Sequence, residues 1–209
     1  MDNEGRPGFL IVLEGVDGAG KTTQADAVEA WLKSHVSRPV VRSREPTQGV
    51  YGQQLRRSMA EGRLAPEDEL ELFLNDRRDH VSQVIAPKLA EGAVVLLDRY
   101  YLSTVAYQGA RGFDPDELLA RNEAFAPVPD LLLILDLDPE RGLERVRARS
   151  EQPPDTFEVL DTLKRSRHIF RELAARLPYA HLVDAHRPRQ TITDDLIAKV
   201  ALLLNPPAA

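Results

Sequence analysis

The sequence predicts an α/β fold of three layers, in which helices cover both faces of a parallel sheet of five strands. Four apolar runs without polar alternation, at residues 9–13, 94–97, 131–137 and 180–183, have the character of strands buried on both faces. A short segment, Val40-Val41, supplies the fifth strand. Helical patterns follow these runs, and alternation of strands with helices is typical of a parallel sheet.

Several of the predicted helices begin at clear signals. Asp114 and Asp138 each stand before a proline and acidic residues, the pattern of a capping aspartate with proline at the first helical position. A third helix opens in the same way at Pro66 and is expected to cover residues 67–89. Its apolar stripe consists of Leu70, Phe73, Leu74, Val81, Val84 and Ile85.

The composition is that of one ordinary globular domain covering residues 1–209. The chain is 43% hydrophobic and 29% charged, so it can bury a real core. Its net charge of -6 argues against extended nucleic-acid binding, which usually needs a basic face. No apolar run approaches the roughly 20 residues that span a membrane, and residues 1–8 do not resemble a signal peptide, so we expect a cytoplasmic protein. The absence of cysteine excludes disulfides and thiolate metal sites, and the five histidines show no ligand spacing.

Residues 15–22 fit the phosphate-binding pattern G-x-x-x-x-G-K-[ST], and their context supports the match. The pattern leaves the predicted strand at 9–13 and enters a helix, so that backbone N–H groups can point at phosphate oxygens. Lys21 can reach the β- and γ-phosphates, and Thr22 can offer its hydroxyl to Mg²⁺. The residues expected to bind the nucleoside triphosphate here are Gly15, Val16, Asp17, Gly18, Ala19, Gly20, Lys21, Thr22 and Thr23.

A second element is expected to help hold the metal. The buried run at 94–97 ends in Asp98, the place where a P-loop protein puts its metal-associated carboxylate, and Arg99 follows at once. The alternative is a strand-end cap with a surface charge. Beside a P-loop, the sequence favours a magnesium site formed by Thr22 and Asp98.

The P-loop alone does not separate kinases from switches or motors. The Asn-Lys-x-Asp sequence by which GTPases read guanine is absent, and a DNA motor would need a longer chain and a basic track. A small kinase needs an acceptor site, and Arg77 points to one because it lies on an apolar helical stripe, four residues after Phe73. An aromatic face beside a planar donor suits a nucleobase, although a structural ion pair for Arg77 and a core position for Phe73 fit the spacing equally well.

Short motifs along the chain resemble one family. They are Glu14-Gly15-Val16-Asp17-Gly18-Ala19-Gly20-Lys21-Thr22-Thr23-Gln24, Arg44-Glu45-Pro46, Phe73 with Asp76-Arg77, Asp98-Arg99-Tyr100 with Ser103 and Ala106-Tyr107-Gln108, and Pro129-Asp130. Over about residues 9–201 the chain is similar to bacterial thymidylate kinases. The resemblance implies a three-layer P-loop kinase fold with a five-stranded parallel sheet and a short lid at about residues 145–158, usually as a homodimer. It also implies phosphoryl transfer from Mg-ATP to dTMP, giving dTDP and ADP in dTTP synthesis.

The resemblance also implies roles for single residues. Phe73 is expected to stack on thymine, Arg77 to hydrogen-bond its edge, Tyr107 to pack against the sugar, and Asp17 to lie close to the 3′-hydroxyl. The remaining acceptor residues that it implies are Gln108 with Ser103 or Thr104 near the base, Arg99 and Arg56 on the monophosphate, and Glu45 beside it.

Catalysis is expected to consist of positioning and charge neutralisation, because an acceptor phosphate with a second pKa of about 6 needs no strong base. The groups implied are Lys21, Asp17, Arg99, Mg²⁺ and a lid arginine. Arg145, Arg147 and Arg149 stand where the lid begins; Arg149 is expected to be catalytic and Arg145 to contact ATP.

Three positions depart from the family pattern. Thr47-Gln48 replaces the usual Gly-Gly, Asn75 replaces a small residue, and Thr156 replaces a lid arginine. Two rival functions stay open: a P-loop kinase for another nucleoside monophosphate or a deoxynucleoside, and a switch or scaffold that binds ATP without transferring phosphate.

Overall fold

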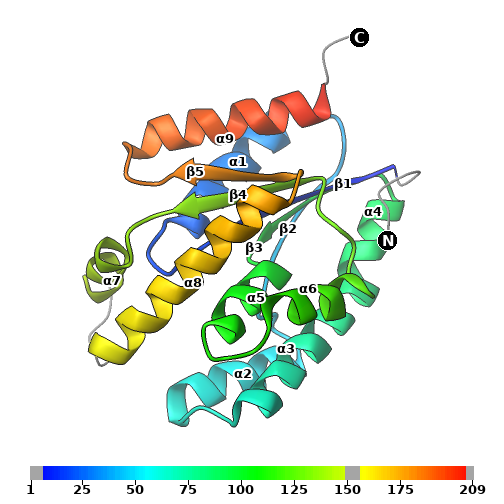
Figure 1. Ribbon diagram of the computed structural model, residues 1–209. Coiled ribbons are helices and arrows are strands. Elements are labelled where there is room, and N and C mark those ends of the chain that lie inside the picture. Colours follow the sequence, from blue (N-terminus) through cyan, green and yellow to red (C-terminus); the bar gives the residue numbers. More distant parts are fainter. Residues whose placement is uncertain (1–6, 149–155, 206–209) are drawn as a thin grey trace.

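A computed structural model describes residues 7–148 and 156–205, and its strands form one parallel sheet. The strand order is β2-β3-β1-β4-β5 (Figure 1). The strands are β1 (Phe9–Gly15), β2 (Val40–Arg44), β3 (Val94–Asp98), β4 (Leu131–Asp136) and β5 (Ala180–Asp184). All five predicted strands are confirmed, although β4 ends at Asp136 and Leu137 already belongs to the loop.

Helices cover both faces of the sheet, as the sequence predicts (Figure 1). Helices α1 (Lys21–His35) and α9 (Arg189–Leu204) pack on one face, whereas α4 (Ala86–Ala90), α5 (Tyr101–Gly109) and α8 (Thr156–Arg176) pack on the other. The structure further contains α2 (Val50–Glu61), α3 (Pro66–His80), α6 (Pro115–Glu123) and α7 (Pro139–Arg147). The three-layer prediction is therefore confirmed.

Strand β1 lies at the centre of the sheet, between β3 and β4. Its side chains Leu10, Ile11, Val12 and Leu13 are fully buried, and each such side chain contributes about 1.5–3 kcal/mol on leaving water. Leu13 pairs in register with Asp98 of β3. Because parallel strands share one carboxyl edge, the loops that follow β1 and β3 meet at that edge, where ligands bind in folds of this kind.

The predicted helix at 67–89 contains a break in its hydrogen-bond pattern. Helix α3 is followed by a π turn, Val81–Ile85, before α4 begins. In this turn the N–H of Ala86 donates to the carbonyl of Val81, five residues earlier. Pro87 explains the change, because its ring lacks an N–H and collides with the carbonyl of the preceding turn in a regular α-helix.

The two predicted aspartate caps have different outcomes. Asp114 caps α6, because its Oδ1 accepts from the N–H groups of Asp116 and Glu117 at 2.8 and 3.1 Å. The prediction for Asp138 is wrong: it precedes α7 without a side-chain cap bond. Its carboxylate instead pairs with Arg167 and lies 3.0 Å from His186 Nε2, since a guanidinium cation competes successfully with backbone amides.

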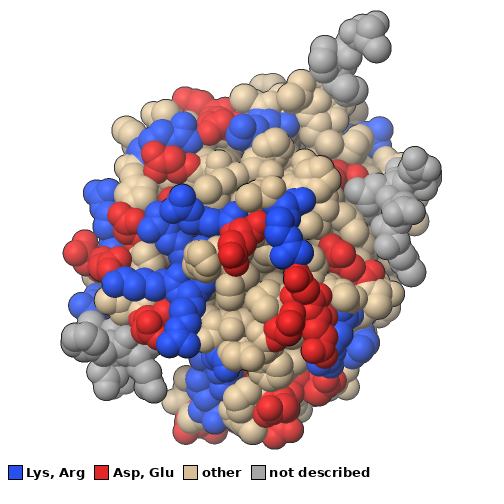
Figure 2. Space-filling model, viewed as in Figure 1, with Lys and Arg blue, Asp and Glu red and all other residues tan. Residues whose placement is uncertain are grey.

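The molecular surface mixes both signs of charge. Figure 2 shows a band of basic side chains on the face that α8 covers, with acidic side chains among them. Examples are the pairs of Lys164 with Glu140 and of Arg176 with Asp116, each at 2.7 Å. Exposed pairs of this kind contribute at most about 1 kcal/mol, so they add little to stability. In the described part of the chain, none of the helices has the length and apolar character to cross a bilayer.

Candidate active site

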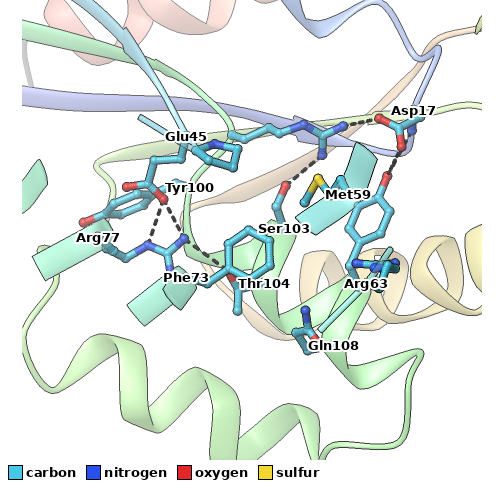
Figure 3. Close-up of a pocket in the computed structure, with 13 residues that line it drawn as sticks. Asp17, Glu45, Met59, Arg63, Phe73, Arg77, Tyr100, Ser103, Thr104 and Gln108 are labelled. Atoms are coloured by element: carbon cyan, nitrogen blue, oxygen red, sulfur yellow. Dashed lines mark hydrogen bonds and ion pairs between the residues drawn. The ribbon is translucent and has the colours of Figure 1, made fainter. Parts of the chain in front are cut away.

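A cavity of about 190 Å³ opens at the carboxyl edge of the sheet, between the loop after β1 and helices α3 and α5 (Figure 3). Its lining residues are Asp17, Glu45, Pro46, Met59, Arg63, Phe73, Arg77, Arg99, Tyr100, Ser103, Thr104, Tyr107 and Gln108. The sequence predicts all of these as acceptor-site residues except Pro46, Met59, Arg63 and Tyr100. Residues from distant parts of the chain are thus brought together around one space large enough for part of a nucleotide.

Arg77 is held almost completely buried at one end of the cavity. Its Nε and Nη2 donate to Glu45 Oε2 at 3.0 and 2.5 Å. Nη2 also donates to Thr104 Oγ1 at 3.1 Å, and Nη1 donates to Asn122 Oδ1 at 2.6 Å. A guanidinium has five N–H groups, so these four bonds leave one N–H of Nη1 without a partner among the described residues. Arg77 therefore fits both readings of the sequence, a buried ion pair and a cavity wall that it shares with Phe73.

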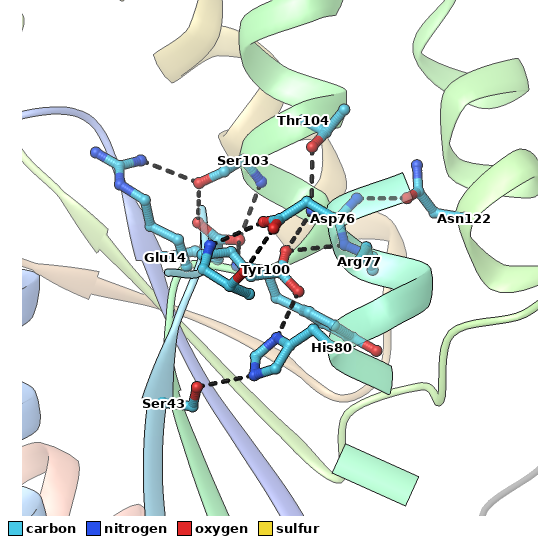
Figure 4. A network of polar contacts seen from close by, with 12 residues as sticks. Glu14, Ser43, Asp76, Arg77, His80, Tyr100, Ser103, Thr104 and Asn122 are labelled. Atoms are coloured by element: carbon cyan, nitrogen blue, oxygen red, sulfur yellow. Dashed lines mark hydrogen bonds and ion pairs between the residues drawn. The ribbon is translucent and has the colours of Figure 1, made fainter. Parts of the chain in front are cut away.

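The second oxygen of Glu45 continues this network (Figure 4). Glu45 Oε1 lies 2.9 Å from His80 Nδ1, and His80 Nε2 lies 2.8 Å from Ser43 Oγ. Burial alone raises the pKa of Glu45, but Arg77 and His80 outweigh it and hold that pKa below its usual value. The sequence gives no role to His80, because only the tertiary fold brings it beside Glu45.

The loop after β2 is anchored on α3 through Asp76. This carboxylate is 2% exposed and accepts from the N–H of Thr47 at 2.8 Å and from its hydroxyl at 2.5 Å. The threonine that replaces the usual glycine thus contributes a bond that glycine cannot make. Arg56 is not among the cavity-lining residues, and its Nη2 donates to Thr47 O at 2.6 Å and to Gln48 Oε1 at 3.0 Å.

Asp17 and Arg99 form an ion pair at the other end of the cavity. Arg99 has φ of 73°, a left-handed conformation that costs a non-glycine residue about 1–3 kcal/mol. Its N–H donates to Leu13 O and its Nη1 to Ser103 Oγ, both at 3.0 Å, and these bonds hold the conformation. The hydroxyl of Tyr107 donates to Asp17 Oδ2 at 3.2 Å. A positive and a negative group therefore stand together where the P-loop borders the cavity.

Glu14 joins β1 to the start of α5. It is fully buried, and its carboxylate accepts from the N–H of Tyr100 at 2.8 Å and from the N–H and hydroxyl of Ser103 at 2.9 and 2.6 Å (Figure 4). Burial raises the pKa of Glu14, and these bonds together with the charge of Arg99 oppose the rise. Glu14 therefore caps the helix that carries Thr104 and Gln108 of the cavity wall, a role hidden from the sequence because 86 residues separate Glu14 from Tyr100.

Lys21 is folded back onto the P-loop. Its Nζ donates to Gly15 O at 2.8 Å and to Val16 O at 2.9 Å. Burial, with a smaller effect from the charge of Arg99, lowers the pKa of Lys21 from 10.5 to about 7. An anion bound in the loop would favour the protonated form, so Lys21 is suited to respond to phosphate.

The P-loop touches α7 through two glycines. Gly18 has φ of 79°, and a Cβ on it would lie 2.1 Å from Gly142 O. A Cβ on Gly142 would in turn lie 2.3 Å from Asp17 O. Only glycine allows this close backbone approach. Gly142 is not predicted from the sequence, although a glycine inside a helix costs about 1 kcal/mol relative to alanine and so indicates a packing reason.

Thr22 and Asp98 meet as predicted. The Thr22 hydroxyl donates to Asp98 Oδ2 at 2.6 Å, at the start of α1 and the end of β3. Thr22 is exposed and Asp98 is 3% exposed. A hydroxyl and a carboxylate are hard oxygen donors of the kind that Mg²⁺ prefers, so the residues fit this ion.

A second hollow lies across the P-loop from the first. It is lined by Gly18, Ala19, Gly20, Thr23, Gln24, Arg145, Ala185, Arg187, Arg189 and Ile192. Arg145 Nη1 donates to Gly18 O at 3.2 Å, so this predicted ATP contact does lie at the P-loop. Arg149 and most of the expected lid lie outside the described residues.

Comparisons with known proteins agree with this geometry. A family model described as thymidylate kinase matches residues 13–196. A thymidylate kinase of Xanthomonas campestris pv. campestris (strain B100) is 51% identical over 197 residues, which are 94% of this chain and 85% of the relative. The thymidylate kinase of Xanthomonas euvesicatoria pv. vesicatoria (strain 85-10) is 55% identical over 85% of this chain and 76% of the relative. That of Xylella fastidiosa (strain 9a5c) is 46% identical over 94% of this chain and 92% of the relative.

Proposed function

The chain belongs to the thymidylate kinase family, and on that premise we propose that it transfers the γ-phosphoryl group of ATP to dTMP. The observation that carries the proposal is the position of the cavity, which ends at the Asp17–Arg99 pair beside the P-loop. A nucleotide seated in the cavity with its phosphate at Arg99 would point that phosphate at the donor site.

The polar groups of the cavity support a thymine base. The remaining N–H of Arg77 and the side-chain nitrogen of Gln108 are both donors, and a pyrimidine with two carbonyl groups offers matching acceptors. Phe73 lines the same space and provides an aromatic face for stacking. Tyr107 borders the cavity beside Asp17, where a deoxyribose would lie, so a 2′-hydroxyl would meet its ring.

The reaction requires two anionic phosphates to meet in line, and the chain supplies cations for this purpose. Lys21 would turn from its backbone carbonyls to the β- and γ-phosphates, and protonation of its amine would follow. Arg99 would share its guanidinium between Asp17 and the acceptor phosphate, since it is already fixed by Ser103. The acceptor oxygen then attacks phosphorus, the bond to the ADP oxygen breaks, and no proton has to be removed first, because a phosphate with a pKa of about 6 is largely dianionic at pH 7.

Thr22 and Asp98 are the residues that would hold Mg²⁺. When bound, the ion neutralises charge on the β- and γ-phosphate oxygens. Glu45 would act from the loop after β2 and Arg56 from helix α2, where Arg56 would reach the monophosphate from its present position on Thr47. The proposed donor site also includes Arg145, Arg149 and a lid at about residues 145–158. We further propose that the enzyme is a homodimer and works in the cytoplasm.

An acceptor assay tests the proposal. ADP release should be measured with Mg-ATP and dTMP, dUMP, dGMP, dCMP or thymidine, side by side. We expect dTMP to give the highest kcat/KM and a diphosphate product. Equal ADP release with and without each acceptor, from a protein that binds ATP, would instead identify a nucleotide-binding switch or scaffold. A higher kcat/KM for another acceptor would keep the proposal of phosphoryl transfer but would replace dTMP as the proposed substrate.

A further inference from the structure

Outside the groups used above, one buried charge cluster borders the cavity. Glu69 of α3 is fully buried, and its two carboxylate oxygens accept from Arg63 and from Arg111. Arg63 precedes α3 and Arg111 follows α5, so the cluster joins the two helices that form the cavity walls. A buried carboxylate between two guanidinium groups is strongly held, because moving either cation away would leave one of its buried oxygens without that partner.

We infer that Arg111 is a positioning residue that fixes which way the side-chain amide of Gln108 faces, and thereby helps the cavity to prefer a carbonyl over an amino group on the base. The inference deepens the proposed function and rests on it for the identity of the nucleotide. Arg111 Nη1, the same atom that donates to Glu69, lies 3.4 Å from Gln108 Oε1.

The chemistry of the two side chains determines the orientation. A guanidinium has donors and no acceptor, so the amide oxygen of Gln108 must face Arg111 and the amide nitrogen must face away. Figure 3 shows this nitrogen on the side of Gln108 that faces Phe73 and Thr104. Gln108 is fully buried, and its Nε2 has no hydrogen-bond partner among the described residues. A buried donor without a partner is rare in native proteins, and here it lines the cavity.

The orientation matters because thymine and cytosine differ on the edge that makes hydrogen bonds, at ring carbon 4 and at N3, which carries a proton only in thymine; thymine also has a 5-methyl group. Thymine has carbonyl oxygens at two positions, whereas cytosine has an amino group in place of one of them. The amino group of cytosine is a hydrogen-bond donor. The Gln108 nitrogen in this orientation and the remaining Arg77 N–H are donors too, so they repel the amino group and cannot accept a hydrogen bond from it. If the amide could turn, its oxygen would face the cavity in place of its nitrogen, so a donor to the thymine carbonyl at ring carbon 4 would be lost and an acceptor for the cytosine amino group would be gained.

The decisive experiment measures binding constants by calorimetry for dTMP and dCMP. We expect Arg111→Met to lower the ratio of Kd for dCMP to Kd for dTMP by up to about tenfold, the effect of one hydrogen bond, and Arg111→Lys, which keeps a donor, to restore most of it. In a Gln108→Leu background, Arg111→Met should change the ratio no further, because its effect passes through Gln108. Should the methionine variant not fold, the double variant Arg111→Met with Glu69→Gln, which also removes the buried charge that Arg111 would leave behind, replaces it.

Arg121→Met is the matched control, since it breaks an exposed arginine–glutamate pair with Glu71 on the same helix as Glu69. The inference is overturned if a folded Arg111→Met protein has an unchanged ratio of Kd for dCMP to Kd for dTMP. It is also overturned if Arg111→Met changes this ratio equally in the presence of Gln108 and in the Gln108→Leu background. ADP release by the unsubstituted protein tests the proposed function separately. A protein that binds dTMP better than dCMP and forms no dTDP would refute the kinase proposal, while the variant ratios would still decide the role of Arg111.

Discussion

The buried pair of Glu45 and Arg77 offers the sharpest test of the site geometry. Glu45→Gln keeps the shape of the side chain and removes its charge, leaving the Arg77 guanidinium, 1% exposed, without a counter-ion. Breaking a buried ion pair from one side costs about 3–5 kcal/mol of stability. For a chain of this length each kcal/mol lowers Tm by roughly 2–4 °C, so Tm should fall by about 6–20 °C.

Urea unfolding and thermal melts measure the loss, and Glu71→Gln is the control. Glu71 pairs with Arg121 on the surface, where both side chains are more than a third exposed, so its loss should cost at most about 1 kcal/mol. A Glu45→Gln protein as stable as the control variant would refute the view that the pair is buried and that water does not screen the charge left on Arg77.

The same pair has a defined pH dependence. The pKa of Glu45 is lower in the folded protein than its ordinary value of 4.5, so the folded state binds fewer protons than the unfolded state in that interval. The stabilisation is therefore complete above pH 4.5 and is lost as the pH falls through the folded pKa. The stability difference between the unsubstituted protein and Glu45→Gln should accordingly shrink below pH 4.5. A difference that stays constant down to pH 3 would contradict this assignment.

Other predictions concern the phosphate end. Because the pKa of Lys21 is about 7, the protein should take up a proton when it binds ATP at pH 8. The binding enthalpy measured by calorimetry should therefore depend on the buffer, and Lys21→Met should abolish that dependence. Equal enthalpies in all buffers would argue against protonation of Lys21. Gly142→Ala places a Cβ 2.3 Å from Asp17 O, so it should lower kcat and Tm together, whereas unchanged kinetics would mean that α7 can move aside freely. Arg99→Ala should reduce kcat by about 100-fold or more while the far-UV circular dichroism stays unchanged, and near-normal turnover would refute the charge-clamp mechanism.

The sequence by itself determined the layers of the fold and the place of the phosphate site. Runs such as residues 9–13 and the glycine pattern at 15–22 carry their information locally, because buried strands need continuous apolar residues and a phosphate loop needs glycines at fixed spacing. Residues at strand ends, such as Asp98, follow from the same logic, since parallel strands share a carboxyl edge.

The tertiary structure decided what each cavity residue can still donate. The bonds of Arg77 to Glu45 and Asn122 bridge 32 and 45 residues of sequence, and those of Glu69 to Arg111 bridge 42. Hydrogen bonds between groups so far apart leave no periodic signal in the chain, because they depend on how helices pack rather than on how one helix turns. Sequence spacing could place Arg77 on an apolar stripe, but only packing could show which of its N–H groups has no partner among the described residues.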